Sequence, residues 1–177
     1  MTNLSGTTTT TMPTPRTRRR AAAAAGVAAL GLSGALAGAA PASAVTQSSA
    51  ASQLSAAGIT WTSSGGCTTR SNSTCTSFDG IRQATIDGAI TLKSASGCAL
   101  QITGGTEVGH STNGTYTHYN GYKLDVHRTT CVDSWVTGHY SYSGLRGDGY
   151  PMYTASSGNV YTNEGNHWDV VYYTCGC

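Results

Sequence analysis

Hydrophobic and polar positions follow two different periods along this chain. Between residues 76 and 96 the period is helical, and one face carries Phe78, Ile81, Thr85, Gly88 and Leu92. A helix is predicted to begin near Ser77, because Thr76 and Asp79 have the spacing of a capping box. Gly97 is placed to end this helix in a left-handed conformation.

Period-two alternation after this helix predicts strands. Residues 98–103 place Leu100 and Ile102 on one face. Residues 121–127 place Leu124 and Val126 on one face and Asp125 on the other. Both segments therefore have the pattern of a strand with one buried face.

The rest of the chain completes an α+β pattern. Residues 150–155 and 167–173 predict two further strands joined by 156–166, and residues 131–136 predict a short helix. Residues 104–116 form a glycine-rich loop, and the small polar segment 45–58 predicts a tail or a marginal helix. We expect a small, mostly antiparallel sheet with packed helices.

The first 44 residues have the features of a secretory signal peptide. Arginines at 16 and 18–20 precede the Ala-rich apolar run 21–40, and small residues before Ala44 offer a cleavage site. The run is too short and too rich in alanine to predict a membrane span. We therefore divide the chain into a signal peptide at 1–44, an N-terminal tail or linker at 45–66, and one domain at 67–177. The domain is expected to be secreted, and association with the cell wall is the more specific expectation.

Charge and cysteine content narrow the function classes. Removal of the leader leaves six basic and eight acidic side chains, a formal charge of −2, so we expect no nucleic-acid partner. Six cysteines in an exported chain predict disulfides, and a cysteine-ligated zinc is the weaker alternative. We expect Cys67 to pair with Cys75, whereas Cys175 and Cys177 are each expected to pair elsewhere, because a bridge across one residue is strained.

Two short motifs carry the chemistry. The first is His118-x-x-Gly121-x-x-x-Asp125, and the second is Glu164-x-x-His167 about forty residues later. A catalytic zinc takes three protein ligands, and two histidines with one carboxylate suit it. Gly121 would let the backbone turn between the first two ligands. Glu164 would stand beside the metal as a general base.

The motifs in this order resemble the zinc D-alanyl-D-alanine carboxypeptidases and dipeptidases, whose fold is shared with the hedgehog signalling domain. That family carries S-x-H-x-x-G-x-A-x-D followed by E-x-x-H. The resemblance implies a hedgehog/DD-peptidase-like fold over roughly residues 76–173, with zinc bound by His118, Asp125 and His167 and with Glu164 as base. It also implies that a zinc-activated water hydrolyses an amide bond of peptidoglycan stem peptides.

The chain departs from the family at the arginine that stabilises the oxyanion. Family enzymes carry it in the loop before the first motif, where this chain reads GGTEVGH with Glu107. Three arginines elsewhere could replace it: Arg82, Arg128 and Arg146. Glu107 itself is expected to be a solvated loop acid rather than a contact for a substrate amine.

Three further histidines are weaker candidates. His110 is the best rival ligand, although we expect a loop residue near the site. His127 shares a strand face with Asp125 but is expected at the surface, and His139 is expected in a loop.

Two alternatives to a zinc peptidase remain open. One is a secreted, non-catalytic module of the same fold that binds a cell-wall or extracellular ligand. The other is a disulfide-rich scaffold whose histidines are incidental. In each case we expect a monomer.

Overall fold

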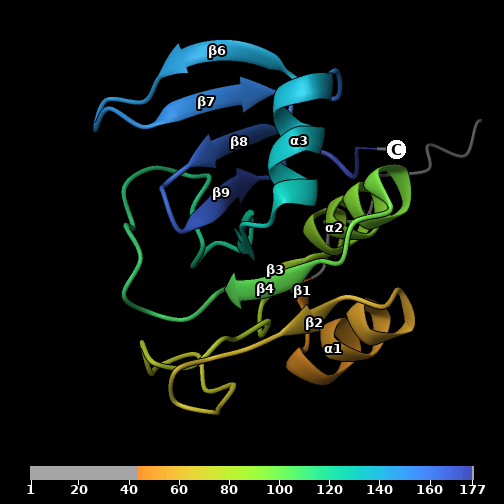
Figure 1. The fold of residues 1–177 in the computed structure, drawn as a ribbon. Coiled ribbons are helices and arrows are strands. Elements are labelled where there is room, and N and C mark those ends of the chain that lie inside the picture. The colour runs from red at the N-terminus through yellow and green to blue at the C-terminus, as the bar shows by residue number, and fades with distance from the viewer. Residues whose placement is uncertain (1–43, 177) are drawn as a thin grey trace, which may run out of the picture. The chain divides into compact units, whose positions relative to one another are not determined.

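A seven-stranded mixed sheet forms the centre of the computed structural model, which describes residues 44–176 (Figure 1). Its spatial order is β2-β4-β5-β9-β8-β7-β6; β2 is parallel to β4, and all other neighbours are antiparallel. The strands are β2 (Thr60–Trp61), β4 (Gln101–Gly104), β5 (Lys123–His127), β6 (Ser141–Leu145), β7 (Pro151–Thr154), β8 (Val160–Asn163) and β9 (His167–Val171). A separate ribbon pairs β1 (Ala44–Val45) with β3 (Ile81–Arg82).

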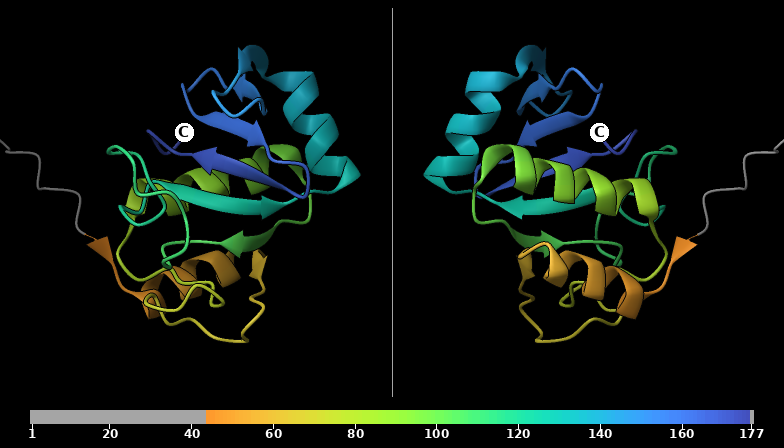
Figure 2. Two further views of the ribbon diagram at one scale, coloured as in Figure 1. Left: turned by 90° about the vertical axis from the view of Figure 1, so that its left-hand side faces the viewer. Right: turned by 90° about the vertical axis from the view of Figure 1, so that its right-hand side faces the viewer.

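Three helices complete the α+β class expected from the sequence: α1 (Gln47–Ala56), α2 (Gln83–Ser96) and α3 (Thr130–His139). Helices α2 and α3 pack on one face of the sheet, and α1 packs beside α2 (Figure 2). The side chains that β5 and β9 turn toward these helices are fully or almost fully buried, namely Leu124, Val126, Trp168 and Val170. The long segment 105–122 covers the other face of the sheet. The side chains that β5 and β9 direct toward that face are mostly polar.

The predicted helix begins six residues later than the sequence pattern indicated. Its N-cap is Arg82, which makes no side-chain capping bond, and the preceding Gly80 has φ +79°. Thr76 instead donates its hydroxyl to the carbonyl of Thr62. The hydroxyl that had suggested a capping box is therefore engaged by a distant segment instead. The end of the helix is as predicted, because Gly97 has φ +66°.

The N-terminal segment 45–66 is part of the fold rather than a tail or linker, and the marginal helix that was the alternative for 45–58 is present as α1. The segment forms α1 and β2, and Ala50 and Leu54 are both 0% exposed. The helix is short and poor in large apolar residues, so its stability depends on packing that a local pattern does not reveal.

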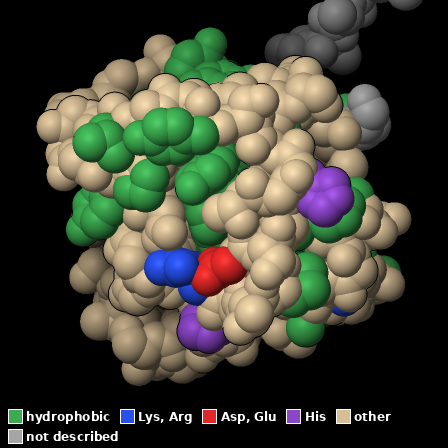
Figure 3. All heavy atoms as spheres, turned by 45° about the horizontal axis from the view of Figure 1, so that its top comes forward, with side chains coloured by type: hydrophobic (Ala, Val, Ile, Leu, Met, Phe, Trp, Pro, Cys, Tyr) green, Lys and Arg blue, Asp and Glu red, His purple; other side chains and the backbone are tan. Residues whose placement is uncertain are grey.

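Strands β6 and β8 were also missed. Strand β8 lies within 156–166, where Val160, Tyr161 and Thr162 pair with both β7 and β9. Strand β6 is one edge of the sheet and exposes Tyr142 and Leu145. Figure 3 shows that hydrophobic side chains gather on one face of the molecule. An edge strand of mixed polarity gives little periodic signal.

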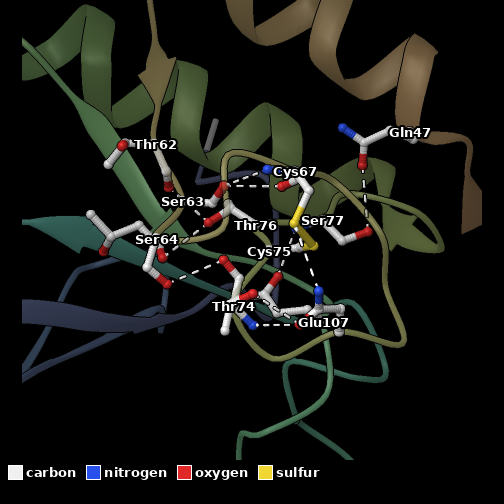
Figure 4. The surroundings of a disulfide bond; sticks show 12 residues. Gln47, Thr62, Ser63, Ser64, Cys67, Thr74, Cys75, Thr76, Ser77 and Glu107 are labelled. Carbon is white, nitrogen blue, oxygen red and sulfur yellow. Dashed lines mark hydrogen bonds between the residues drawn. A yellow bond between two sulfur atoms is a disulfide. The ribbon is translucent and has the colours of Figure 1, made fainter.

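Two disulfide bonds with known partners cross-link separate parts of the domain. Cys67 pairs with Cys75 as expected (Figure 4), and Cys98 pairs with Cys131. Cys175 is also disulfide-bonded, and Cys177 lies outside the described residues. Because the first four cysteines pair with one another, Cys175 does not bond to any of them, contrary to our expectation.

The predicted signal peptide lies outside the described residues apart from Ala44. No helix among residues 44–176 has the length and apolar character needed to cross a bilayer. The disulfides and this finding are compatible with an extracellular protein.

Candidate metal centre

The polar face of β5 and β9 forms the floor of a cavity of about 510 Å³. The two strands pair so that Asp125 lies directly opposite Asp169, and His127 lies opposite His167. Alternation along each strand points these side chains away from α2 and α3. The sheet therefore places two carboxylates side by side on the face that the 105–122 segment covers.

All four residues singled out by the two sequence motifs line this cavity. His118 comes from the 105–122 segment, Asp125 from β5, His167 from the first position of β9, and Glu164 from the turn between β8 and β9. The Nε2 atoms of His118 and His167 lie 3.3 Å and 3.5 Å from Asp125 Oδ1. Glu164 Oε2 lies 3.3 Å from His167 Nε2.

Hydrogen bonds outside the cavity orient both histidines. His118 Nδ1 is 2.8 Å from the carbonyl oxygen of Gly105, and His167 Nδ1 is 2.8 Å from Asn166 Oδ1. Because an oxygen of either kind only accepts, each Nδ1 carries the proton. In the neutral rings the Nε2 lone pairs therefore face Asp125. Histidines that bind metals commonly have their other ring nitrogen held in this way.

Two buried carboxylate oxygens lack hydrogen-bond partners. With the histidines in these neutral tautomers, no described residue donates a hydrogen bond to the buried Asp125 Oδ1 or Asp169 Oδ1. Buried polar atoms without partners are rare, and a bound cation would supply the missing partner. Four carboxylates and two cationic side chains line the cavity, leaving a formal charge of −2. A divalent cation bound at Asp125 Oδ1 would satisfy that oxygen and cancel this charge.

The ionisation of His118 and Asp125 reflects the same electrostatics. Burial alone would lower the pKa of His118, but the hydrogen bond and negative charge of Asp125 outweigh it, and the pKa is raised. Burial alone would raise the pKa of Asp125, but the hydrogen bond and charge of His118, with the other histidines, lower it. A metal bound through His118 Nε2 would therefore have to displace a proton that is held more tightly than on a free imidazole.

His110 belongs to the same cluster, although we expected a loop residue near the site. His110, His118 and Asp125 offer ligand atoms that all lie within 4.8 Å of one another, so they could hold a metal ion. The rings of His110 and His118 stack, with centroids 3.8 Å apart and planes 14° apart. A nitrogen lone pair lies in its ring plane, so two stacked rings cannot both bind one ion at about 2.0 Å. In this conformation only one of these two rings can be a ligand.

Glu107 is buried, contrary to the expected solvated loop acid. It is 3% exposed and accepts hydrogen bonds from the backbone N–H groups of Ser77 and Gly105. Figure 4 shows Glu107 beside Ser77 and the Cys67–Cys75 disulfide. Burial alone would raise its pKa, but the hydrogen bond from His110 and those from the backbone lower it. Glu107 is therefore an ionised anchor that holds His110 through a 3.0 Å contact with Nε2.

Among the three arginines that could replace the missing one, Arg146 lines the cavity. It lies just after β6, and its guanidinium contacts Glu164 Oε1 at 2.5 Å, Asp169 Oδ2 at 3.0 Å and Asp148. These carboxylates raise the pKa of Arg146 further above its already high value. Arg128 instead bonds Asp133 and the carbonyl of Gly165.

Asp169 and Lys123 were not recognised as site residues from the sequence. Lys123 Nζ lies 2.7 Å from Asp169 Oδ2. Asp169 is two residues after His167 on one strand, so period-two alternation could have placed both on one face. His127 is exposed and does not line the cavity, and His139 lies at the end of α3 rather than in a loop.

Gly121 makes the tight turn between the first two motif residues, as expected. Its φ is +75°, and a Cβ there would lie 2.6 Å from the carbonyl oxygen of Gly80. We expect Gly121→Ala to lower the free energy of unfolding by about 2–5 kcal/mol, from left-handed strain and overpacking. Urea denaturation would measure the loss.

Gly114→Ala is the matched control for this change. Gly114 has φ +87° but no atom within 4 Å of the added Cβ, so only the conformational cost of about 1–2 kcal/mol is expected. Equal losses in the two variants would show that close packing around Gly121 contributes nothing.

Comparison of the chain with protein-family models, with curated proteins and with solved structures finds no match.

Proposed function

We propose that this protein is a secreted zinc-dependent peptidase that hydrolyses an amide bond of peptidoglycan stem peptides. The zinc ligands are His118, Asp125 and His167, and Glu164 is the general base. The peptidoglycan substrate and the kinship with the hedgehog/DD-peptidase fold follow from the motif resemblance. The metal chemistry is supported by the geometry around Asp125.

The observation that carries the proposal is the buried Asp125 Oδ1 with two imidazole nitrogens 3.3 Å and 3.5 Å away. Two ligands bound at about 2.0–2.1 Å to a tetrahedral zinc lie roughly 3.3–3.4 Å apart. Asp125 Oδ1 therefore has ligand spacing from each of the two nitrogens separately. The group of described residues whose ligand atoms all lie within 4.8 Å of one another is His110, His118 and Asp125, without His167. His110 is left out of the proposed ligand set because its ring stacks on that of His118.

Bound zinc would polarise the substrate carbonyl and lower the pKa of a water molecule to about 7. Glu164 Oε2 faces the site and would take a proton from the attacking water as its oxygen bonds to the carbonyl carbon. Glu164 would then give this proton to the leaving amine nitrogen as the C–N bond breaks. The proton taken from the water is thus transferred to the amine product, and Glu164 returns to its ionised form.

Arg146 supports this role of Glu164. Its contact with Glu164 Oε1 fixes the carboxylate so that Oε2 remains directed toward His167. Arg146 is therefore a positioning residue in this arrangement. Three carboxylates already engage its guanidinium, so it is not free to meet a substrate oxyanion without leaving them.

The test is metal analysis combined with peptidoglycan digestion. We expect about one zinc per chain and release of peptide fragments, loss of release after chelation, and recovery when zinc is restored. A peptidase assay in which chelation has no effect would contradict the proposal. Stoichiometric zinc without any peptide release would instead favour the non-catalytic binding module.

A further inference from the structure

His110 also lines the cavity, and its role is distinct from that of the proposed zinc ligands. Its Nε2 lies 3.0 Å from Glu107 Oε1, and its ring stacks on His118. Two contacts therefore fix the ring of a residue in an otherwise glycine-rich loop. A carboxylate that orients an imidazole is a recurrent arrangement at reactive sites.

The tautomer of His110 follows from these contacts. Glu107 is ionised and has no proton to donate, so Nε2 carries the proton and donates it to Glu107. In the neutral ring, Nδ1 has only a lone pair. This atom lies 3.8 Å from Asp125 Oδ2 and makes no hydrogen bond with the described residues. Two acceptors thus face each other at the wall of the cavity, where a hydrogen-bond donor of a ligand can reach them.

A peptide substrate offers one kind of backbone donor, the amide N–H. We propose that His110 Nδ1 accepts a hydrogen bond from the N–H of the substrate amide at the cleavage site. Glu107 holds the ring in the tautomer and orientation that this contact needs. This inference rests on the proposed peptidase function and assigns substrate selection to the Glu107–His110 pair.

The other acceptors among the described residues of the cavity are already engaged: Ser111 accepts from the Asn113 N–H, and Asp148 and Asp169 are held by Arg146. The cationic side chains Arg146 and Lys123 can only donate, and both are engaged by carboxylates. Glu164 is assigned to the attacking water. His110 is therefore the uncharged acceptor through which the site can distinguish a secondary amide from one that lacks the N–H.

The experiment compares a synthetic stem-type peptide with its counterpart methylated at the nitrogen of the cleaved bond. The enzymes are the zinc-loaded wild type, His110→Ala, and His127→Ala as a matched loss of a nearby exposed imidazole. We expect His110→Ala to lower kcat/KM about 10- to 100-fold for the N–H peptide and much less for the methylated one. Its preference between the two substrates should therefore collapse, whereas His127→Ala should keep the wild-type preference.

Zinc affinity is the second readout and separates a substrate contact from a metal ligand. Titration against a chelating dye should give His110→Ala an affinity within a few-fold of the wild type, and thermal unfolding should show that it is folded. A large loss of zinc affinity, or equal losses on the two substrates, would overturn the inference and leave the peptidase function standing. Failure of the zinc-loaded wild type to cleave either peptide would contradict both this inference and the proposed peptidase function.

Discussion

Replacing Glu164 by glutamine is expected to abolish most peptide hydrolysis while leaving zinc binding intact. Glutamine keeps the size of the side chain but cannot take a proton from water. Proton transfer by a positioned group contributes about 10²- to 10⁴-fold, so kcat should fall within that range. Glu164 contacts His167 and Arg146 but is not among the proposed ligands, so zinc affinity should change little.

Asp79→Asn is the matched control for the Glu164 variant. It makes the same carboxylate-to-amide change at an exposed position that does not line the cavity. Both variants and the wild type would be assayed for release of peptide fragments and for bound zinc. If Glu164→Gln lost its zinc together with its activity, Glu164 would be a ligand and the assignment of the base would be wrong.

The second large effect is expected at Asp125, where asparagine should remove most zinc binding. Asp125 is the common neighbour of His118, His167 and His110, and it is the one carboxylate in the proposed ligand set. Its loss removes the negative charge that faces the cation. The affinity should fall by more than the about 10- to 100-fold typical of residues outside the ligand set.

Thermal unfolding with and without zinc gives an independent measure of the same effect. Zinc at 100 times its dissociation constant should stabilise the wild type by about 2.7 kcal/mol, and it should leave Asp125→Asn nearly unchanged. Asp87→Asn on α2 provides an isosteric control away from the cavity, and it should respond as the wild type does. Equal stabilisation of all three proteins would place the metal elsewhere.

Most elements with one buried face could be predicted from the sequence. The alternation of Leu124 and Val126 identified β5, and Gly97 marked the end of α2. The start of α2 could not be predicted, because the polar groups of 76–79 bond to distant segments. Helix α1 and strands β6 and β8 depend on neighbours far along the chain, which local periodicity does not encode.

The residues of the site likewise fall into those that the sequence identified and those that only the structure revealed. The two motifs identified His118, Asp125, Glu164 and His167 by type and spacing, and all four line one cavity. The sequence did not reveal that Glu107 is buried, because its partners are backbone N–H groups that any residue could supply. It also did not reveal which arginine would reach Glu164, since Arg146 is 18 residues away and depends on the β6–β7 turn.

The sequence by itself determined the chemical groups of this site, the α+β class and the Cys67–Cys75 bridge. These features depend on residue type and short spacing, which are local properties of the chain. Only the tertiary structure decided how these groups are arranged. Register between β5 and β9 set Asp125 against Asp169, and stacking set the ring of His110 against that of His118, so that only one of these two rings can bind an ion in this conformation. Both depend on contacts between distant segments, because packing and hydrogen bonding in three dimensions fix the orientation of a side chain.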